Sequence, residues 1–256
     1  MIASEPALRA LMVEIGRWMH EQGWVAANDG NLSARLADGR ILCTPTRVSK
    51  GRMGPEDLIL VDPEGRKISG SRETTSEIFM HLTIYRLRAD VQAVVHAHTP
   101  FATGFAAAGK ALNLAMLPEV VVLLGSVPLA PYGLPGTAAL SESLRPLIPH
   151  HDAILMANHG VVTYGEDLEA AYYKMEMVEH FARIAFVAEQ LGGPTVLPRE
   201  EVEKLVAARE RYGVHRPASF GAAPLTAEDQ PLPDRAERER ITGLIEEILR
   251  SRGVLR

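Results

Sequence analysis

Two β-hairpin signals in the first 70 residues constrain the fold most strongly. Asp38-Gly39 separates two short apolar runs, 32–36 and 40–44, and Pro63-Glu64-Gly65 separates a second pair of runs. Such turn residues between apolar segments favour tight turns that join antiparallel strands. We therefore expect a sheet that is at least partly antiparallel.

Helical patterns are intermixed with these strands. Apolar residues recur at the helical period from Leu8 to Met19 and from Leu168 to Phe181. Further helices are expected at 74–88, 99–109, 137–147 and 199–212, and strands at 91–98 and 153–156. The apolar runs at 119–124 and 127–129 are expected to be strands or packed loops. This mixture predicts an α/β protein.

The character of the chain changes near residue 194. A charged helical segment, a proline-rich stretch at about 213–233 and an amphipathic helix around 241–249 follow. We expect a main domain over 1–193 and a C-terminal helical extension over 194–256. The extension is predicted to pack on the body or on a neighbouring subunit.

Composition excludes several classes of protein. The chain has 256 residues, 46% of them hydrophobic and 23% charged, which is typical of a folded globular protein. A net charge of -5 excludes a general basic field for nucleic acid, and the single Cys43 excludes an intrachain disulfide framework and a cysteine-based zinc site. Apolar runs are too short to span a membrane, and we expect neither a signal peptide nor membrane association. A cytoplasmic protein is expected.

A His-x-His motif is the sharpest chemical feature. His96 and His98 lie in a predicted strand, where residues two apart share a face. His159 directly follows the apolar run that contains Ile154 and Met156. Three neutral imidazoles with an open fourth position are the layout of a catalytic metal site. Spacing alone also allows three structural histidines.

A second motif opens the helix predicted at 74–88. Thr74 and Glu77 match a capping box, in which each side chain satisfies a free backbone donor of the other. The same segment could bind an anion through Thr75, Ser76 and the free N–H groups of the helix end. Glu77 could serve as a general base or a metal ligand, provided that it faces the cleft.

Two polar loops, 28–31 and 44–51, offer further donors. Their glycine, asparagine and threonine residues can donate to an anion, and Arg47 and Lys50 add positive charge. Ordinary solvated turns would have the same composition.

Taken in order, six short stretches of this sequence resemble the class II aldolase/adducin-head family, and the resemblance covers about residues 7–192. The stretches are Gly30-Asn31-Leu32-Ser33, Thr44-Pro45-Thr46, Thr75-Ser76-Glu77, His96-Ala97-His98, Ala130-Pro131-Tyr132 and Asn158-His159-Gly160.

The resemblance implies a single α/β/α domain with a largely antiparallel central sheet between helical layers. It also implies a homotetramer with active sites at subunit interfaces. His96, His98 and His159 would bind Zn2+ or a similar ion such as Mn2+ or Co2+, and Glu77 would be the acid–base residue and a possible fourth ligand. The residues at the family's phosphate positions are Asn31, Thr46, Thr75 and Ser76.

Three positions depart from the family pattern. Arg47 stands where glycine is common, Thr74 where proline is common, and Leu117 near the position of a catalytic tyrosine from a neighbouring subunit. Lys50 is added to the phosphate-binding residues on its charge alone.

The predicted function is a metal-dependent aldolase that cleaves a C–C bond of a small phosphorylated sugar of the ketose 1-phosphate type through an enediolate. A decarboxylase or a sugar-phosphate epimerase would use the same scaffold, and Arg47 could favour a carboxylate, so the partner is a sugar phosphate or a hydroxy or keto acid. A non-catalytic adducin-like interaction module would have lost metal ligands, yet all three histidines and Glu77 are present.

Overall fold

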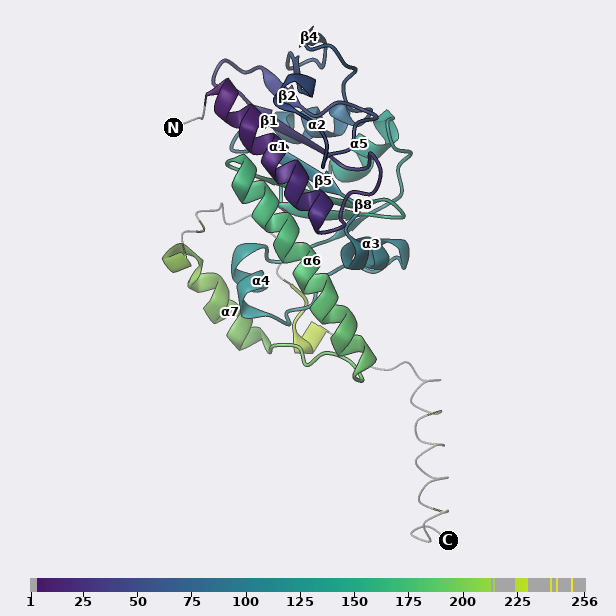
Figure 1. Ribbon diagram of the computed structural model, residues 1–256. Coiled ribbons are helices and arrows are strands. Elements are labelled where there is room, and N and C mark those ends of the chain that lie inside the picture. Colours follow the sequence, from purple (N-terminus) through teal and green to yellow (C-terminus); the bar gives the residue numbers. More distant parts are fainter. Residues whose placement is uncertain are drawn as a thin grey trace.

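The fold is built on one eight-stranded sheet with helices on both faces (Figure 1). The computed structural model describes residues 4–212, 214, 224–229, 240, 243 and 250. The strand order is β4-β3-β2-β1-β5-β8-β7-β6, and all neighbours are antiparallel except the parallel pair β6 and β7. The strands are β1 (Asn31–Arg35), β2 (Ile41–Cys43), β3 (Ile59–Val61), β4 (Lys67–Ser69), β5 (Ala93–Ala97), β6 (Leu129–Ala130), β7 (Ala153–Met156) and β8 (Gly160–Gly165).

The helices form two layers. The longer ones, α1 and α6, cover one face of the sheet together with α3 and α4, whereas α2 and α5 cover the other face. Helix α7 packs against α4 at the edge of the first layer. The helices are α1 (Glu5–Glu21), α2 (Ile78–Leu87), α3 (Pro100–Ala107), α4 (Pro118–Leu123), α5 (Ala138–Leu144), α6 (Leu168–Gln190) and α7 (Arg199–Ala207).

Alternation along the central strands divides the core in two. On β5, Val95 and Ala97 face the α1/α6 layer, whereas Val94 faces the α2/α5 layer, as side chains of successive strand residues must. All five residues of β5 are buried, because helices cover both of its faces. A polar side chain on this strand therefore lies inside the protein, and this placement determines the surroundings of His96.

Both predicted hairpins are confirmed. Strand β1 pairs with β2, with Ser33 opposite Cys43, and β3 pairs with β4. The antiparallel sheet between helical layers is confirmed as well.

Two predictions about the second half of the body need correction. The run at 119–124 is largely helical, as part of α4, rather than a strand or loop; Pro118 starts this helix, and proline is favoured in a first turn. Strand β8 was not predicted, although Val161 and Val162 give it β-branched character. Short apolar runs do not distinguish helix from strand by periodicity alone.

The C-terminal predictions are tested only in part. The charged helix is shorter than expected, because α7 ends at Ala207 and a 3-10 turn covers Arg209–Tyr212. Most of the stretch at 213–233, and most of the amphipathic helix expected around 241–249, lie outside the described residues. The division at residue 193 stays a prediction.

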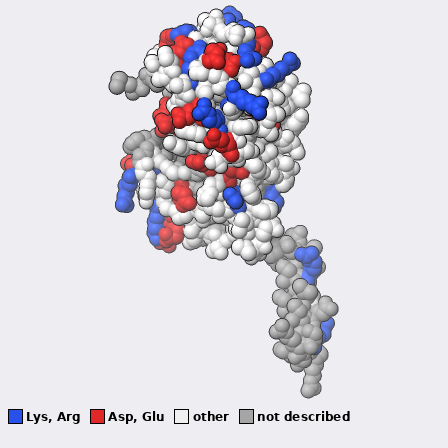
Figure 2. Space-filling model, in the orientation of Figure 1, with Lys and Arg blue, Asp and Glu red and all other residues white. Residues whose placement is uncertain are grey.

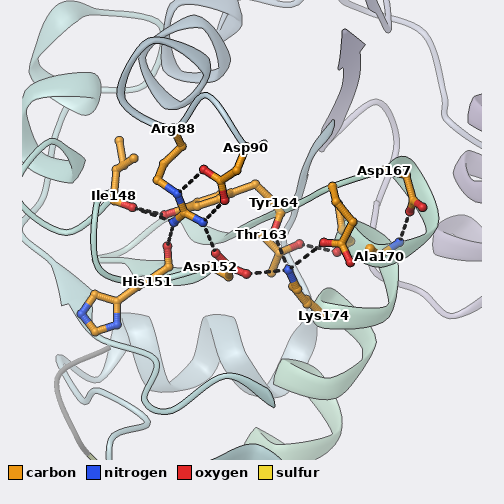
Figure 3. A network of polar contacts seen from close by, with 12 residues as sticks. Arg88, Asp90, Ile148, His151, Asp152, Thr163, Tyr164, Asp167, Ala170 and Lys174 are labelled. Atoms are coloured by element: carbon orange, nitrogen blue, oxygen red, sulfur yellow. Dashed lines mark hydrogen bonds and ion pairs between the residues drawn. The ribbon is translucent and has the colours of Figure 1, made fainter. Parts of the chain in front are cut away.

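A buried ionic network joins α2, β7 and α6 (Figure 3). The Arg88 guanidinium lies 2.7 Å from an oxygen of Asp90 and 3.0 Å from one of Asp152. Lys174 contacts the other oxygen of Asp152, whose side chain has no exposed area. Lys174 also lies 3.8 Å from an oxygen of Glu166. Asp90 precedes the start of β5 and Glu166 follows the end of β8, so this network lies at one end of the central strands. The histidines lie at the other end.

On the face drawn in Figure 2, Lys and Arg side chains are interspersed with Asp and Glu side chains, so this face carries no broad basic patch. Among the described residues, no helix is long and apolar enough to cross a membrane.

Candidate active site

The three predicted histidines lie together at one end of the sheet. His96 is on β5, His98 directly follows this strand, and His159 lies in the turn between β7 and β8. The pairing of β5 with β8, in which Ala97 lies opposite Val161, brings the strand end next to this turn. The ring centroids are 4.8–5.2 Å apart.

Gly160 makes this approach possible. A Cβ atom at this position would lie 2.6 Å from the Ala97 carbonyl oxygen and 2.8 Å from Cδ2 of His98. Both distances are too short for van der Waals contact, so any larger residue would push the turn away from His98.

The hydrogen bonds of the rings define which nitrogens are free. The Nδ1–H of His96 donates to the Val161 carbonyl at 2.8 Å, which leaves Nε2 with its lone pair. Nδ1 of His98 lies 3.5 Å from an oxygen of Asp29, so Nε2 of this ring also points into the cluster. Burial lowers the pKa of His96 to about 3, which keeps the ring neutral at pH 7. A neutral ring is the form that binds a metal.

These nitrogens have the spacing of a metal site. Nε2 of His96 and Nε2 of His98 are 3.2 Å apart, and one ligand atom from each of the three histidines lies within 4.8 Å of the others. A tetrahedral zinc ion with Zn–N bonds of 2.0–2.1 Å holds its nitrogen ligands about 3.4 Å apart. In the described part of the chain, two buried atoms beside this cluster accept or donate no hydrogen bond: Oε1 of Glu77 and Nδ1 of His159. The donor set therefore fits a divalent ion.

Glu77 faces the same point. Its two carboxylate oxygens lie 3.3 Å from Nε2 of His96 and 3.2 Å from Nε2 of His159. Burial alone would raise the pKa of Glu77, but the two imidazoles and the amide of Asn31 together hold it well below its usual range. Glu77 is thus an ionised carboxylate beside three imidazoles.

The capping-box interpretation of this segment is wrong. Helix α2 begins at Ile78, and its N-cap residue is Glu77, with no side-chain capping bond. Thr74 instead forms an isolated bridge with Pro45 in the neighbouring loop. The carboxylate is therefore free to face the site, which is the alternative that the sequence left open.

A cavity of about 160 Å³ opens beside the carboxylate. It is lined by most of the predicted anion-binding residues, together with Glu77, His98 and His159. The predicted residues that line it are Asn31, Thr46, Lys50, Thr75 and Ser76.

Arg47 is the one predicted anion-binding residue that does not line this cavity. It is exposed and is absent from the cavity lining. Its φ angle of 59° is in the left-handed region, a backbone conformation that glycine adopts more readily than other residues.

Lys50 is buried, although it lies in a loop. It is 1% exposed, and its Nζ donates to the carbonyls of Asn28 and Val48, both at 2.9 Å. Burial lowers the pKa of Lys50 to about 8, while the nearby Asp29 opposes this effect. An ammonium group has three N–H donors, so one remains for a ligand in the cavity.

Two residues near the site were not predicted. Asp29 lies against His98, and His81 is fully buried behind Glu77, where it contacts Asn31 at 2.5 Å. His81 follows Glu77 by four residues, so the shared helix face was readable from the sequence. Asp29 stands in the polar loop 28–31, but nothing in the sequence marked this acid as a neighbour of His98.

A larger cavity, of about 660 Å³, lies between α3, α4 and α6. Leu117 and Glu119 line it, but none of the three clustered histidines does. Leu117 and Glu119 are therefore not part of the histidine site of this chain.

Comparison with known proteins agrees with this fold. A family model described as "Class II Aldolase and Adducin N-terminal domain" matches residues 10–186. The chain belongs to this family.

Individual relatives differ in their named activity. A 3-oxo-tetronate 4-phosphate decarboxylase from Pectobacterium atrosepticum is 37% identical over 190 residues, which cover 73% of this chain and 87% of the relative. A 5-deoxy-D-ribulose 1-phosphate aldolase from Bacillus thuringiensis is 31% identical over 207 residues, which cover 80% and 96%. A solved structure of an L-fuculose 1-phosphate aldolase aligns with a TM-score of 0.75 and 29% identity, and covers 83% of this chain and 98% of that one.

Proposed function

We propose that the protein is a metal-dependent carbon–carbon lyase, an aldolase acting on a small phosphorylated ketose of the ketose 1-phosphate type. One observation carries the proposal. Three imidazoles and the Glu77 carboxylate converge beside a small cavity that a buried lysine also lines.

His96, His98 and His159 are proposed to hold the metal, which we take to be Zn2+, or Mn2+ or Co2+. Bound there, a divalent ion supplies Lewis acidity that polarises the substrate carbonyl beside the breaking bond. The hydrogen bond from His96 Nδ1 to Val161 orients that ring and fixes its tautomer.

Glu77 is proposed as the acid–base residue. Its Oε1 accepts no hydrogen bond and is buried beside the cavity, so it can take a proton from a substrate hydroxyl or return one to carbon. Asn31 holds the other oxygen at 2.8 Å, which leaves Oε1 as the reactive atom.

The remote phosphate is proposed to bind in the cavity. Thr46, Thr75 and Ser76 offer hydroxyl and backbone donors, and Lys50 supplies a buried positive charge. Arg47 could contribute only from the exposed rim, since its side chain is outside the cavity lining.

Decarboxylation is a second candidate, favoured by a relative named as a 3-oxo-tetronate 4-phosphate decarboxylase. Loss of CO2 from a β-keto acid leaves the same kind of carbanion next to a carbonyl. Glu77 could then pass a proton from water to that carbon.

We also propose that the active unit is a homotetramer with sites at subunit interfaces. Tyr132 and Leu134 are more than half exposed, and Pro135, in the same loop, lines the cavity. A neighbouring subunit packed on this loop would add groups to the site. Sedimentation analysis of the purified protein should give four chains; a monomer would refute this part.

The test is a substrate panel with metal-loaded protein. Ketose 1-phosphates should yield a triose phosphate and an aldehyde, whereas 3-oxo acid 4-phosphates would yield CO2 if decarboxylation is the reaction. Glu77→Gln should retain metal and lose most of the rate. Absence of turnover on every compound would refute the proposed function.

A further inference from the structure

Behind Glu77, a chain of buried polar side chains leads away from the cavity. Nδ2 of Asn31 is 2.8 Å from Oε2 of Glu77, and Nε2 of His81 is 2.5 Å from Oδ1 of Asn31. Oγ of Ser33 then lies 2.7 Å from Nδ1 of His81 and 2.8 Å from the Tyr85 hydroxyl. None of these five residues is more than 7% exposed.

The chain follows from the geometry of one strand packed on one helix. Asn31 and Ser33 are two apart on β1, while Glu77, His81 and Tyr85 recur every four residues along the start and body of α2. Two residues along a strand advance about 6.6 Å, and four along a helix about 6.0 Å. The two repeats therefore stay in step, and strand and helix side chains alternate along the interface.

The direction of every hydrogen bond in this chain is determined. Asn31 donates through Nδ2 to Oε2 of Glu77, so its Oδ1 is turned towards His81. Oδ1 only accepts, so Nε2 of His81 carries the proton. Burial lowers the pKa of His81 to about 4, so the ring is neutral and its Nδ1 must accept from Ser33. The Ser33 oxygen then accepts from Tyr85.

We infer that Tyr85, Ser33, His81 and Asn31 form a one-way chain of hydrogen-bond donors that positions the Glu77 carboxylate. Hydrogen bonds aligned in this way polarise one another in a buried environment. His81 is thus a positioning residue: it never meets the substrate, but it fixes which end of the Asn31 amide faces Glu77.

This inference rests on the proposed acid–base role of Glu77, but its first test does not. In metal-free protein with ¹⁵N-labelled histidine, His81 should show a neutral ring protonated at Nε2, with a slowly exchanging proton. Asn31→Leu should abolish that slow exchange. A ring protonated at Nδ1 in the unaltered protein would overturn the inference, whatever the enzyme does.

The second test separates positioning from stability. His81→Leu should lower kcat on the order of 10- to 100-fold and leave KM within about threefold, as for other residues that orient an active-site group. His81→Gln keeps a donor towards Asn31 and should restore much of the rate. Equal losses in both variants would contradict the inference.

A matched control is available at the far end of the chain. Tyr85→Phe removes the last donor and should lower kcat by less than His81→Leu does. Tyr164 is also buried and also donates its hydroxyl, to the Ile148 carbonyl, but it belongs to the network at the other end of the strands. Tyr164→Phe should leave kcat unchanged at a similar loss of stability. If kcat followed stability in all these variants, the residues would be structural only. If the unaltered enzyme turned over no compound of the panel, the proposed function would fail while the histidine spectrum still decided the inference.

Discussion

Lys50→Met should change the pH dependence of stability in a defined way. The folded protein lowers the pKa of Lys50 from 10.5 to about 8, mainly through burial. In free energy this fall corresponds to about 3 kcal/mol, because each tenfold change in an equilibrium constant is worth about 1.4 kcal/mol. Methionine has a similar length and carries no charge.

The sign follows from proton binding. Below pH 8 both the folded and the unfolded protein hold the Lys50 proton, and the folded state bears the full cost of the buried charge. Between about pH 8 and 10.5 the folded state releases the proton first, so the unfolding free energy of the unaltered protein rises relative to that of Lys50→Met. Lost hydrogen bonds to Asn28 and Val48 add an offset that is nearly independent of pH.

Urea unfolding at several pH values from 7 to 10.5 measures this difference. The advantage of Lys50→Met over the unaltered protein should fall by about 3 kcal/mol across that range. The exposed Lys110, changed to Met, should give a difference that does not vary with pH. If the stability difference between Lys50→Met and the unaltered protein also did not vary with pH, the assignment of a buried ammonium group beside the cavity would be refuted.

Three further predictions concern the site and its support. Gly160→Ala should destabilise the protein by about 1–3 kcal/mol in urea unfolding and weaken metal retention on dialysis, because the added Cβ meets the Ala97 carbonyl. Unchanged metal retention would show that the turn need not lie close to His98. Asp152→Ala should lower the unfolding free energy by about 3–5 kcal/mol, because it removes the carboxylate that the buried Arg88 and Lys174 share. Asp38→Ala, which breaks an exposed ion pair, should change the melting temperature little. Similar melting temperatures for the two variants would contradict the account of the network. Thr75→Val should raise KM for a phosphorylated substrate with a smaller effect on kcat, and an unchanged KM would remove Thr75 from the phosphate site.

Local signals in the sequence were sufficient for the hairpins and the long helices. Asp38-Gly39 determines a tight turn within a few residues, and the apolar face of α6 repeats over many turns. Helix α4 and strand β8 were not predicted correctly, because a short, continuously apolar run has no periodicity that distinguishes helix from strand. Packing against other elements determines the conformation of such a run. Their identity depends on neighbours that are distant in the sequence.

The candidate site shows the same division. The His-x-His spacing places His96 and His98 on the same face of one predicted strand. Their contact with His159 depends on the pairing of β5 with β8. Sequence could not decide whether Glu77 caps its helix or faces the cleft, because both use the same residues. Nor could it place Arg47 outside the cavity and Lys50 inside it, since both are cations in one loop.

Metal content of the purified protein tests the central claim most directly. Elemental analysis should find one divalent ion per chain in the unaltered protein. The control variant His180→Ala, which changes an exposed histidine on α6, should hold the same amount. His98→Ala should be folded by circular dichroism and should have lost the ion. A full complement of metal in His98→Ala, or none in the unaltered protein after metal is supplied, would contradict the assignment of this cluster as a metal centre.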